Sequence, residues 1–210
     1  MTKKLTIDLS EDTDWDFLYE KNHISVYSLH PAGSKLIAFR GDSVLPCSMG
    51  TLYTLISEAK YRRLWIDRVS EIVMTMENYQ TNESCEYSLI GMPFPIKDRY
   101  FYTYTIAKYY PKEKLIHAKS RDNHEAMEIE EPDAIRASLI DSNFKLQFID
   151  DKETFISISM LIDPCGLIPS HLVNLLQSEW AYNTLSRLGK LCEDDGIDIA
   201  AQYQNLLKGK

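Results

Sequence analysis

Hydrophobic and polar residues alternate along much of the chain between Glu71 and Ile162, a period of two that is typical of β-strands with one buried face. Clusters of Pro, Asn and Asp interrupt the alternation and indicate turns, including one at Asp141-Ser142. We therefore expect strands at residues 72–77, 84–90, 100–108, 115–120, 134–140, 143–149 and 154–162. Consecutive strands with short connections predict an antiparallel meander.

The chain before residue 71 predicts a mixture of helices and strands. Residues 14–22 are expected to form a short opening helix, with Asp12 or Thr13 as its N-cap and acidic residues in its first turn. Residues 23–30 and 36–44 alternate on either side of a Pro-Ala-Gly-Ser turn, which predicts a β-hairpin. Ser48 then caps a helix with apolar residues from 49 to 56, and a second short helix is expected over 60–66.

A long amphipathic helix is predicted from Ser170 to about Glu193, because apolar residues recur there at steps of three and four. The stripe consists of Val173, Leu176, Trp180, Thr184, Leu188 and Leu191. Pro164, Gly166 and Pro169 end the preceding strand, and a proline suits the start of a helix because its missing N–H has no partner there. Such a stripe needs a large apolar surface to cover.

These elements predict an α+β fold of the helix-grip kind. A curved antiparallel sheet of about eight or nine strands would wrap around the long C-terminal helix, with two short helices after the second strand. No linker or repeat divides the chain, so we expect one domain over 1–210, with a core at about 14–193 and a tail at 194–210 that is a further helix candidate. A sheet of this size closed by one helix tends to leave an interior cavity.

Charge and composition limit the classes of partner that the chain can be expected to bind. The formal net charge is −8, which repels phosphate backbones, so we expect no nucleic-acid partner. No apolar run approaches the ~18 residues of a membrane span, and no apolar leader follows Met1, so we expect a cytoplasmic protein. The four cysteines are far apart and form no C-x-x-C, which favours free thiols and leaves a disulfide pair as the alternative.

No sequence feature supports a metal, cofactor or catalytic site. The five histidines lack metal-ligand spacing, and the acid pairs fall at turns, where a paired-carboxylate catalyst has no support. Nucleotide-binding glycine motifs and the G-x-S-x-G nucleophile motif are missing as well. We therefore expect no catalytic residue, no metal and no cofactor.

Three segments carry a resemblance to a known family. They are Trp65-Ile66-Asp67 after the two short helices, the loop Gly-Met-Pro-Phe-Pro-Ile-Lys-Asp-Arg-Tyr-Phe at 91–101, and Gly166-Leu167-Ile168-Pro169 before the long helix. In this order, over about Phe17 to Cys192, they resemble the "W-x-D" segment, the Pro-rich loop ending in arginine and the "G-x-I-P" helix entry of the START (steroidogenic acute regulatory protein-related lipid transfer) domain family, in the helix-grip superfamily.

The resemblance implies binding of a lipid or another hydrophobic small molecule in a tunnel between sheet and helix. It also implies that the 91–99 loop and the C-terminal helix move to admit the ligand. The apolar tip of this loop, Met92-Pro93-Phe94-Pro95, suits transient membrane contact, and the alternative is a loop packed onto the end helix. Sterol-binding members place a second arginine on the strand after the loop, where this chain has tyrosines, so Tyr102 and Tyr104 become candidates for a polar head. The candidate ligand-binding residues are Trp65, Glu86, Met92, Phe94, Arg99, Tyr102, Tyr104, Met160, Val173, Leu176, Trp180 and Thr184.

Glu86 is the most informative of these residues. If its face of the strand lines the cavity, the carboxylate is buried and needs a partner, for which Arg99 on the next strand is the candidate. If that face is convex, Glu86 points to water. Two other functions remain open: an enzyme on the same scaffold, a cyclase or hydrolase of aromatic or polyketide substrates, and an interaction module with a filled core. The ligand's identity and the oligomeric state are not fixed by the sequence.

Overall fold

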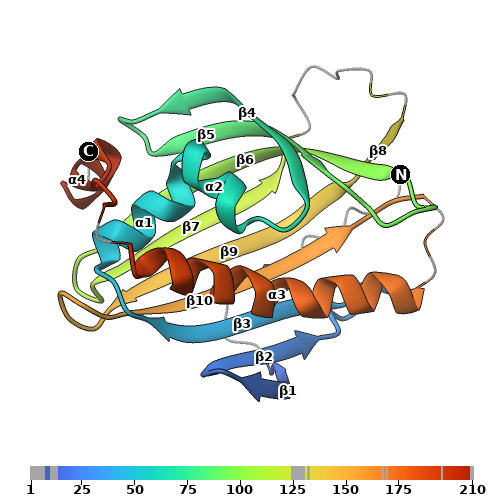
Figure 1. Cartoon of the computed structure of the whole chain (residues 1–210), viewed down its shortest axis with the longest axis horizontal. Helices are drawn as coiled ribbons and strands as arrows, with labels where there is room; N and C mark the ends of the chain where they lie inside the picture. The colour runs from blue at the N-terminus through green and yellow to red at the C-terminus, as the bar shows by residue number, and fades with distance from the viewer. Residues whose placement is uncertain are drawn as a thin grey trace.

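A single curved sheet of ten strands forms the body of the protein, as the computed structural model shows (Figure 1). The structure describes residues 8–9, 14–123, 131, 133–166, 168, 170–194 and 196–208, and of 170–178 only the backbone. The strands are β1 (Asp16–Lys21), β2 (Ile24–Leu29), β3 (Ala38–Leu45), β4 (Val69–Asn78), β5 (Glu83–Ile90), β6 (Asp98–Tyr110), β7 (Leu115–Asp122), β8 (Ala134–Arg136), β9 (Ser138–Phe148) and β10 (Thr154–Asp163).

The strand order explains how the sheet closes around a helix. It runs β1-β2-β3-β10-β9-β7-β6-β5-β4, all antiparallel, and β8 adds to β6 in parallel beyond the end of β7. The first three strands thus join the rest of the sheet through the pairing of β3 with the last strand, β10. The predicted helix-grip fold is confirmed, with ten strands in place of eight or nine.

Four helices accompany the sheet: α1 (Met49–Ser57), α2 (Ala59–Trp65), α3 (Ser170–Cys192) and α4 (Ala201–Leu207). The long α3 crosses one face of the sheet, and α1 and α2 lie beside it on the same face (Figure 1). Ser48 caps α1 as predicted, since its Oγ accepts the N–H of Thr51 at 3.1 Å. None of the helices in the described part of the chain is long and apolar enough to cross a bilayer.

A glycine on β3 lets α3 lie close to the sheet. A Cβ added at Gly41 would come within 2.9 Å of Leu185 Cδ1 and 3.2 Å of Ala181 Cβ. Leu185 and Ala181 are themselves fully buried. This end of α3 is therefore packed directly on the strands, and any open space must lie elsewhere along the helix.

The predicted opening helix over 14–22 is wrong, because residues 16–21 form the edge strand β1. Asn22 and His23 have φ of 51° and 61°, the left-handed pair that a two-residue hairpin turn requires, and they fold β1 back onto β2. The Phe17 ring also packs edge-on against Tyr27, with 5.7 Å between centroids. Pairing with a neighbouring strand has outweighed the helix-start signal of the acidic residues.

The predicted turn at Asp141-Ser142 is also wrong, because both residues lie inside the continuous strand β9. Asp141 is fully buried, yet its carboxylate accepts the N–H of Leu9 at 2.7 Å and the Nδ2 of Asn143 at 2.9 Å. The ammonium of Lys119 lies 3.4 Å away. With so many partners, an acidic residue typical of turns is stable in the middle of a strand.

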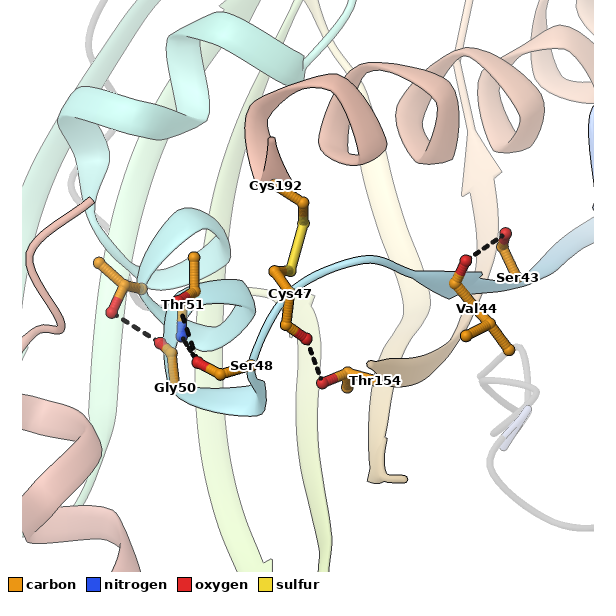
Figure 2. Close-up of a disulfide and its surroundings, with 9 residues drawn as sticks. Ser43, Val44, Cys47, Ser48, Gly50, Thr51, Thr154 and Cys192 are labelled. Atoms are coloured by element: carbon orange, nitrogen blue, oxygen red, sulfur yellow. Dashed lines mark hydrogen bonds between the residues drawn. A yellow bond between two sulfur atoms is a disulfide. The ribbon is translucent and has the colours of Figure 1, made fainter. Parts of the chain in front are cut away.

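A disulfide joins Cys47 to Cys192, at the junction of β3 with α1 and at the last residue of α3 (Figure 2). The two Cα atoms are 5.2 Å apart, within the range that a disulfide spans. The backbone there is fixed further by Thr154, whose Oγ1 donates to the Cys47 carbonyl at 2.9 Å (Figure 2). The expectation of free thiols is therefore wrong for this pair, and cysteine spacing no longer supports a reducing compartment. Cys85 and Cys165 are free.

Candidate ligand-binding cavity

A cavity of about 250 Å³ opens between the sheet and the helices α2 and α3. This is just below the range of about 300–1,000 Å³ that is usual for ligand pockets. Its wall is contributed by β5, β6, β7, β9 and β10, by the loop that follows β5, and by the turn between β10 and α3. The pocket therefore lies on the face of the sheet that α3 covers, where the sequence predicts a ligand site.

The wall is mainly apolar, with a polar group of residues on the strands and α2. Hydrophobic side chains in the lining include Ile90, Phe101, Leu139, Phe144, Met160 and Ile162. Polar residues in it include Arg62, Glu86, Ser88, Thr103, Ser120 and Ser142. An apolar pocket with a few convergent polar groups is the usual form of a small-molecule site.

Glu86 is buried in this wall, with 5% of its surface exposed, and Arg62 on α2 is its partner. The guanidinium of Arg62 donates to Glu86 Oε1 at 3.1 Å and forms a close ion pair with Oε2. Burial raises the pKa of Glu86 above the usual carboxyl range, and the guanidinium of Arg62 opposes that rise. The cavity thus holds one carboxyl group whose charge is costly and depends on one neighbour.

The predicted pairing of Glu86 with Arg99 is wrong, because the register of β5 on β6 separates them. Glu86 lies opposite Thr103, whereas Arg99 lies opposite Ile90, four residues further along β5. At about 3.4 Å per residue the two positions are roughly 14 Å apart along the strands. Sequence reasoning could not see that α2 would bring Arg62 closer than the neighbouring strand does.

Arg99 has different partners, since its guanidinium donates to backbone carbonyls at one edge of the cavity. Nε donates to Pro164 O at 2.6 Å and Nη2 to Cys165 O at 3.1 Å, while Nη1 donates to Lys97 O. Arg99 is only 3% exposed, and burial lowers the pKa of its guanidinium. This side chain therefore ties the end of the 91–99 loop to the turn that precedes α3.

Half of the predicted ligand-binding residues line the cavity. They are Trp65, Glu86, Met92, Arg99, Met160 and Trp180. The Trp65 ring lies 5.8 Å from that of Phe144, and its indole N–H donates to the Leu55 carbonyl at 2.8 Å. Trp65 is thus fixed as part of the wall, while Trp180 brings α3 to the cavity.

Four other predicted residues do not line it. Tyr102 and Tyr104 lie on the opposite face of β6, because side chains alternate along a strand and Arg99, Phe101 and Thr103 occupy the inner face. Phe94 is 98% exposed at the tip of the loop, and Thr184 is buried against the sheet outside the cavity. The side chains of Val173 and Leu176 lie outside the described residues.

Several lining residues were missed by the sequence analysis. Arg62 sits in a Tyr-Arg-Arg sequence on a short helix, with no signal to separate it from its neighbour Arg63. Phe101 and Thr103 could have been found from Arg99. If Arg99 faces the cavity, alternation along the strand places Phe101 and Thr103 on the same face. Among the described residues, no group of three or more His, Cys, Asp or Glu could hold a metal ion.

The sequence of this chain is similar to a known protein family and to individual proteins. A family model described as the START domain matches residues 1–194. An uncharacterized protein of Pseudomonas aeruginosa is 26% identical over 181 residues, which cover 86% of this chain and 87% of that protein. A phosphatidylcholine transfer protein of Mus musculus is 24% identical over 184 residues, which cover 86% of this chain and 85% of that protein.

Solved structures share the fold. Human StAR-related lipid transfer protein 5 has a TM-score of 0.78 at 13% identity, and the match covers 88% of each chain. A STAR-related lipid transfer protein fragment from Xanthomonas axonopodis has a TM-score of 0.75 at 20% identity, covering 86% of this chain and 99% of the fragment. At these identities the likeness establishes the arrangement of sheet and C-terminal helix.

Proposed function

This chain belongs to the START domain family, and from that premise we propose that it binds a lipid or another hydrophobic small molecule in the cavity beneath α3. We propose further that it carries the ligand between membranes, an activity stated in the name of its relative, phosphatidylcholine transfer protein. The protein would act by burial alone, without changing its cargo.

The observation that carries this proposal is the hollow, mainly apolar interior next to one buried ion pair. A methylene group moved from water into such a wall gains about 0.8 kcal/mol, so a single acyl chain supplies ample binding energy. The Arg62–Glu86 pair offers charged hydrogen-bonding groups at which a polar head can be oriented. A plain interaction module would have no use for this space, because a cavity costs stability.

Entry of the ligand requires the 91–99 loop and the start of α3 to separate. Arg99 supports this assignment, because its contacts with Lys97, Pro164 and Cys165 hold together the two segments that border the cavity. At the tip of the same loop, the exposed ring of Phe94 is suited to enter a bilayer edge. Transient membrane contact at this tip would place the entrance against the lipid supply.

Native mass spectrometry of the purified protein, joined to a vesicle transfer assay, tests the proposal. We expect a bound lipid mass and faster passage of a fluorescent phospholipid from donor to acceptor vesicles. Phe94→Asp should slow transfer several-fold, because a carboxylate opposes entry into the apolar bilayer. Phe17→Asp is the matched control, since Phe17 is exposed on β1, away from the loop. A protein that takes up no lipid and speeds no transfer would refute the proposal.

Glu86 also supports a second candidate function, an enzyme on the same scaffold that acts on an aromatic or polyketide substrate. A buried carboxyl with a raised pKa is suited to act as a general acid near neutral pH. In that case the same cavity would hold a substrate, and Glu86 would be needed for turnover. Carriage and catalysis therefore predict different consequences for the loss of one carboxyl group.

A further inference from the structure

A second, smaller cavity of about 80 Å³ lies beyond the first, between α1, the β4–β5 hairpin and α4. The residues Arg62, Trp65, Ser120 and Phe144 line both cavities, so the two spaces adjoin at this wall. The larger one is bordered by the entrance loop, whereas the smaller one lies at the far end of the sheet. We call the smaller space the polar compartment.

The polar compartment carries negative charge. Glu77 lines it, and the cationic Arg62 in its wall is already neutralised by Glu86. Glu83 lines it too, but its carboxylate accepts a hydrogen bond at 2.6 Å from Tyr104, on the opposite face of β6, and so lies away from the space. The rings of Tyr53 and Tyr79 also line the space. A carboxylate beside aromatic rings favours a cationic group.

Two buried acceptors in the same lining distinguish between kinds of cation. Ser57 Oγ and Asn82 Oδ1 are shielded from solvent and have no hydrogen-bond partner among the described residues. Unpaired buried polar atoms are costly and rare in folded proteins. A primary ammonium carries three N–H donors that can satisfy them, whereas a quaternary ammonium carries none.

The cover of the polar compartment comes from outside the span that matches the family model. That match ends at residue 194, and Gln202 on α4 lines the compartment. Gln202 Nε2 donates to Glu58 Oε1 at 3.3 Å, and the Ala200 N–H donates to Thr54 Oγ1 at 2.9 Å, so α4 is held on α1. The compartment is thus completed by a segment of this chain that the family pattern does not describe.

We propose that the polar compartment receives the head group of a membrane lipid that bears a primary amine. This inference rests on the proposed lipid-binding function and adds the class of head group. The ammonium is attracted by Glu77 and donates to Ser57 Oγ and Asn82 Oδ1, while the acyl chains occupy the larger cavity. Choline head groups, which lack N–H donors, leave both acceptors unpaired.

Competition between lipids tests the proposal. The full-length protein is incubated with mixed vesicles holding equal amounts of phosphatidylethanolamine, phosphatidylcholine and phosphatidylglycerol with identical acyl chains, and the bound lipids are weighed by native mass spectrometry. We expect roughly tenfold enrichment of phosphatidylethanolamine, as two additional hydrogen bonds would give. Equal loading of the ethanolamine and choline lipids, or preference for the glycerol lipid, overturns the inference. Uptake of none of the three instead contradicts the proposed function itself.

Two variants separate recognition from folding. Asn82 has φ of 55°, which glycine adopts readily, so Asn82→Gly removes the acceptor without strain. Ser57→Ala removes the other acceptor, and it should leave thermal stability unchanged or higher because its Oγ has no partner to lose. Each variant should bind as much total lipid as the wild type and lose most of the ethanolamine preference. Retention of the preference in Ser57→Ala overturns the inference even if Asn82→Gly does not fold.

Matched controls are available elsewhere in the chain. Asn22→Gly makes the same change at a turn with φ of 51°, and Ser70→Ala removes an exposed hydroxyl that bonds Leu89 O at 3.1 Å. Neither residue lines either cavity. Both control variants should keep the wild-type preference, and its loss in either one would count against recognition at the polar compartment.

Discussion

At the scale of single residues, the Arg62–Glu86 pair is the most demanding feature of the interior. Both charges are largely removed from water, and the loss of solvation can exceed their mutual attraction. The balance at Glu86 favours the protonated form more than in water, since its pKa is raised. A polar ligand group that bonds either partner would therefore relieve a cost that the empty protein carries.

Glu86→Gln tests this balance and the choice between carrier and enzyme. A raised pKa in the folded state means that Glu86 stabilises the fold below about pH 4.3 and loses this contribution as pH rises through the raised value. Glutamine cannot titrate, so the free energy of unfolding of the variant should rise relative to that of the wild type as pH rises. The total rise should be about 1.4 kcal/mol for each pKa unit by which folding raises the pKa of Glu86. Chemical unfolding at several pH values measures the difference. If the wild type instead becomes more stable than Glu86→Gln as pH rises, the attraction of Arg62 lowers the pKa of Glu86 by more than burial raises it.

The same variant separates the two functions. In a carrier, Glu86→Gln weakens ligand binding but still permits transfer between vesicles. In an enzyme on this scaffold it abolishes turnover, because the acid is lost. Loss of a measurable catalytic rate would overturn the proposal of a non-catalytic carrier.

Residue positions were predictable where strand alternation applied and not where a distant element supplied the contact. Glu86 was found because a mid-strand acid must face either cavity or water. Tyr102 and Tyr104 were predicted on the wrong face of β6. Once Arg99 is placed on the cavity side, alternation along the strand puts both tyrosines on the opposite side. Arg62 could not have been found, because its contact depends on how α2 is set against β5.

At the scale of elements, one side chain bridges the two loops at the proposed entrance. Arg99 begins β6, and the carbonyls that it binds belong to the loop before it and to the turn before α3. Guanidinium is suited to this role, because its donors are fixed in a plane and spread over several directions. The loop and the helix start should therefore open together.

Arg99→Lys should loosen the entrance without disrupting the sheet. An ammonium group cannot reach three separate carbonyls, so at least one charged hydrogen bond is lost, at a cost of about 1.5–3 kcal/mol. We expect a lower melting temperature and faster lipid release from preloaded protein, measured by dilution into lipid-free vesicles. Arg63→Lys is the matched control, as Arg63 Nη2 donates to Ile72 O at 3.0 Å. Equal lipid release rates for Arg99→Lys and Arg63→Lys would show that Arg99 does not control ligand release.

Most elements were predictable from periodicity, and the errors share a cause. The helices α1, α2 and α3 and the central strands follow from the spacing of apolar residues. The opening helix and the Asp141-Ser142 turn failed because each relied on the local preference of acidic residues. Long-range partners decided both cases: β2 for the first strand, and Leu9, Asn143 and Lys119 for the buried Asp141.

At the scale of the whole molecule, the Cys47–Cys192 disulfide closes a very large loop. The sequence separation is 145 residues, so the bond ties the first third of the chain to the end of α3. The overall helix-grip fold was predictable from the helix stripe and three short segments. Neither this cross-link nor the polar compartment was, because both depend on which distant segments meet.

Cys192→Ser should lower the free energy of unfolding by roughly 2–4 kcal/mol, the usual worth of a structural disulfide. For a chain of this length that corresponds to a melting temperature lower by roughly 5–15 °C. Cys85→Ser and Cys165→Ser, at the two free cysteines, are the controls and should melt near the wild type. Four titratable thiols in the denatured, unreduced protein, where two are expected, would contradict the bond.

The same cross-link decides how the covering helix can swing. Its last residue is bonded to Cys47 at the end of β3, so in the proposed opening this end would act as the pivot and the opposite end would move. A helix of 23 residues is about 35 Å long, and a tilt of about 10° would lift its far tip by roughly 6 Å. Under the proposed entry route the helix would act as a lever, because a small rotation near Cys192 would be magnified at the far tip, beside which the cargo would pass.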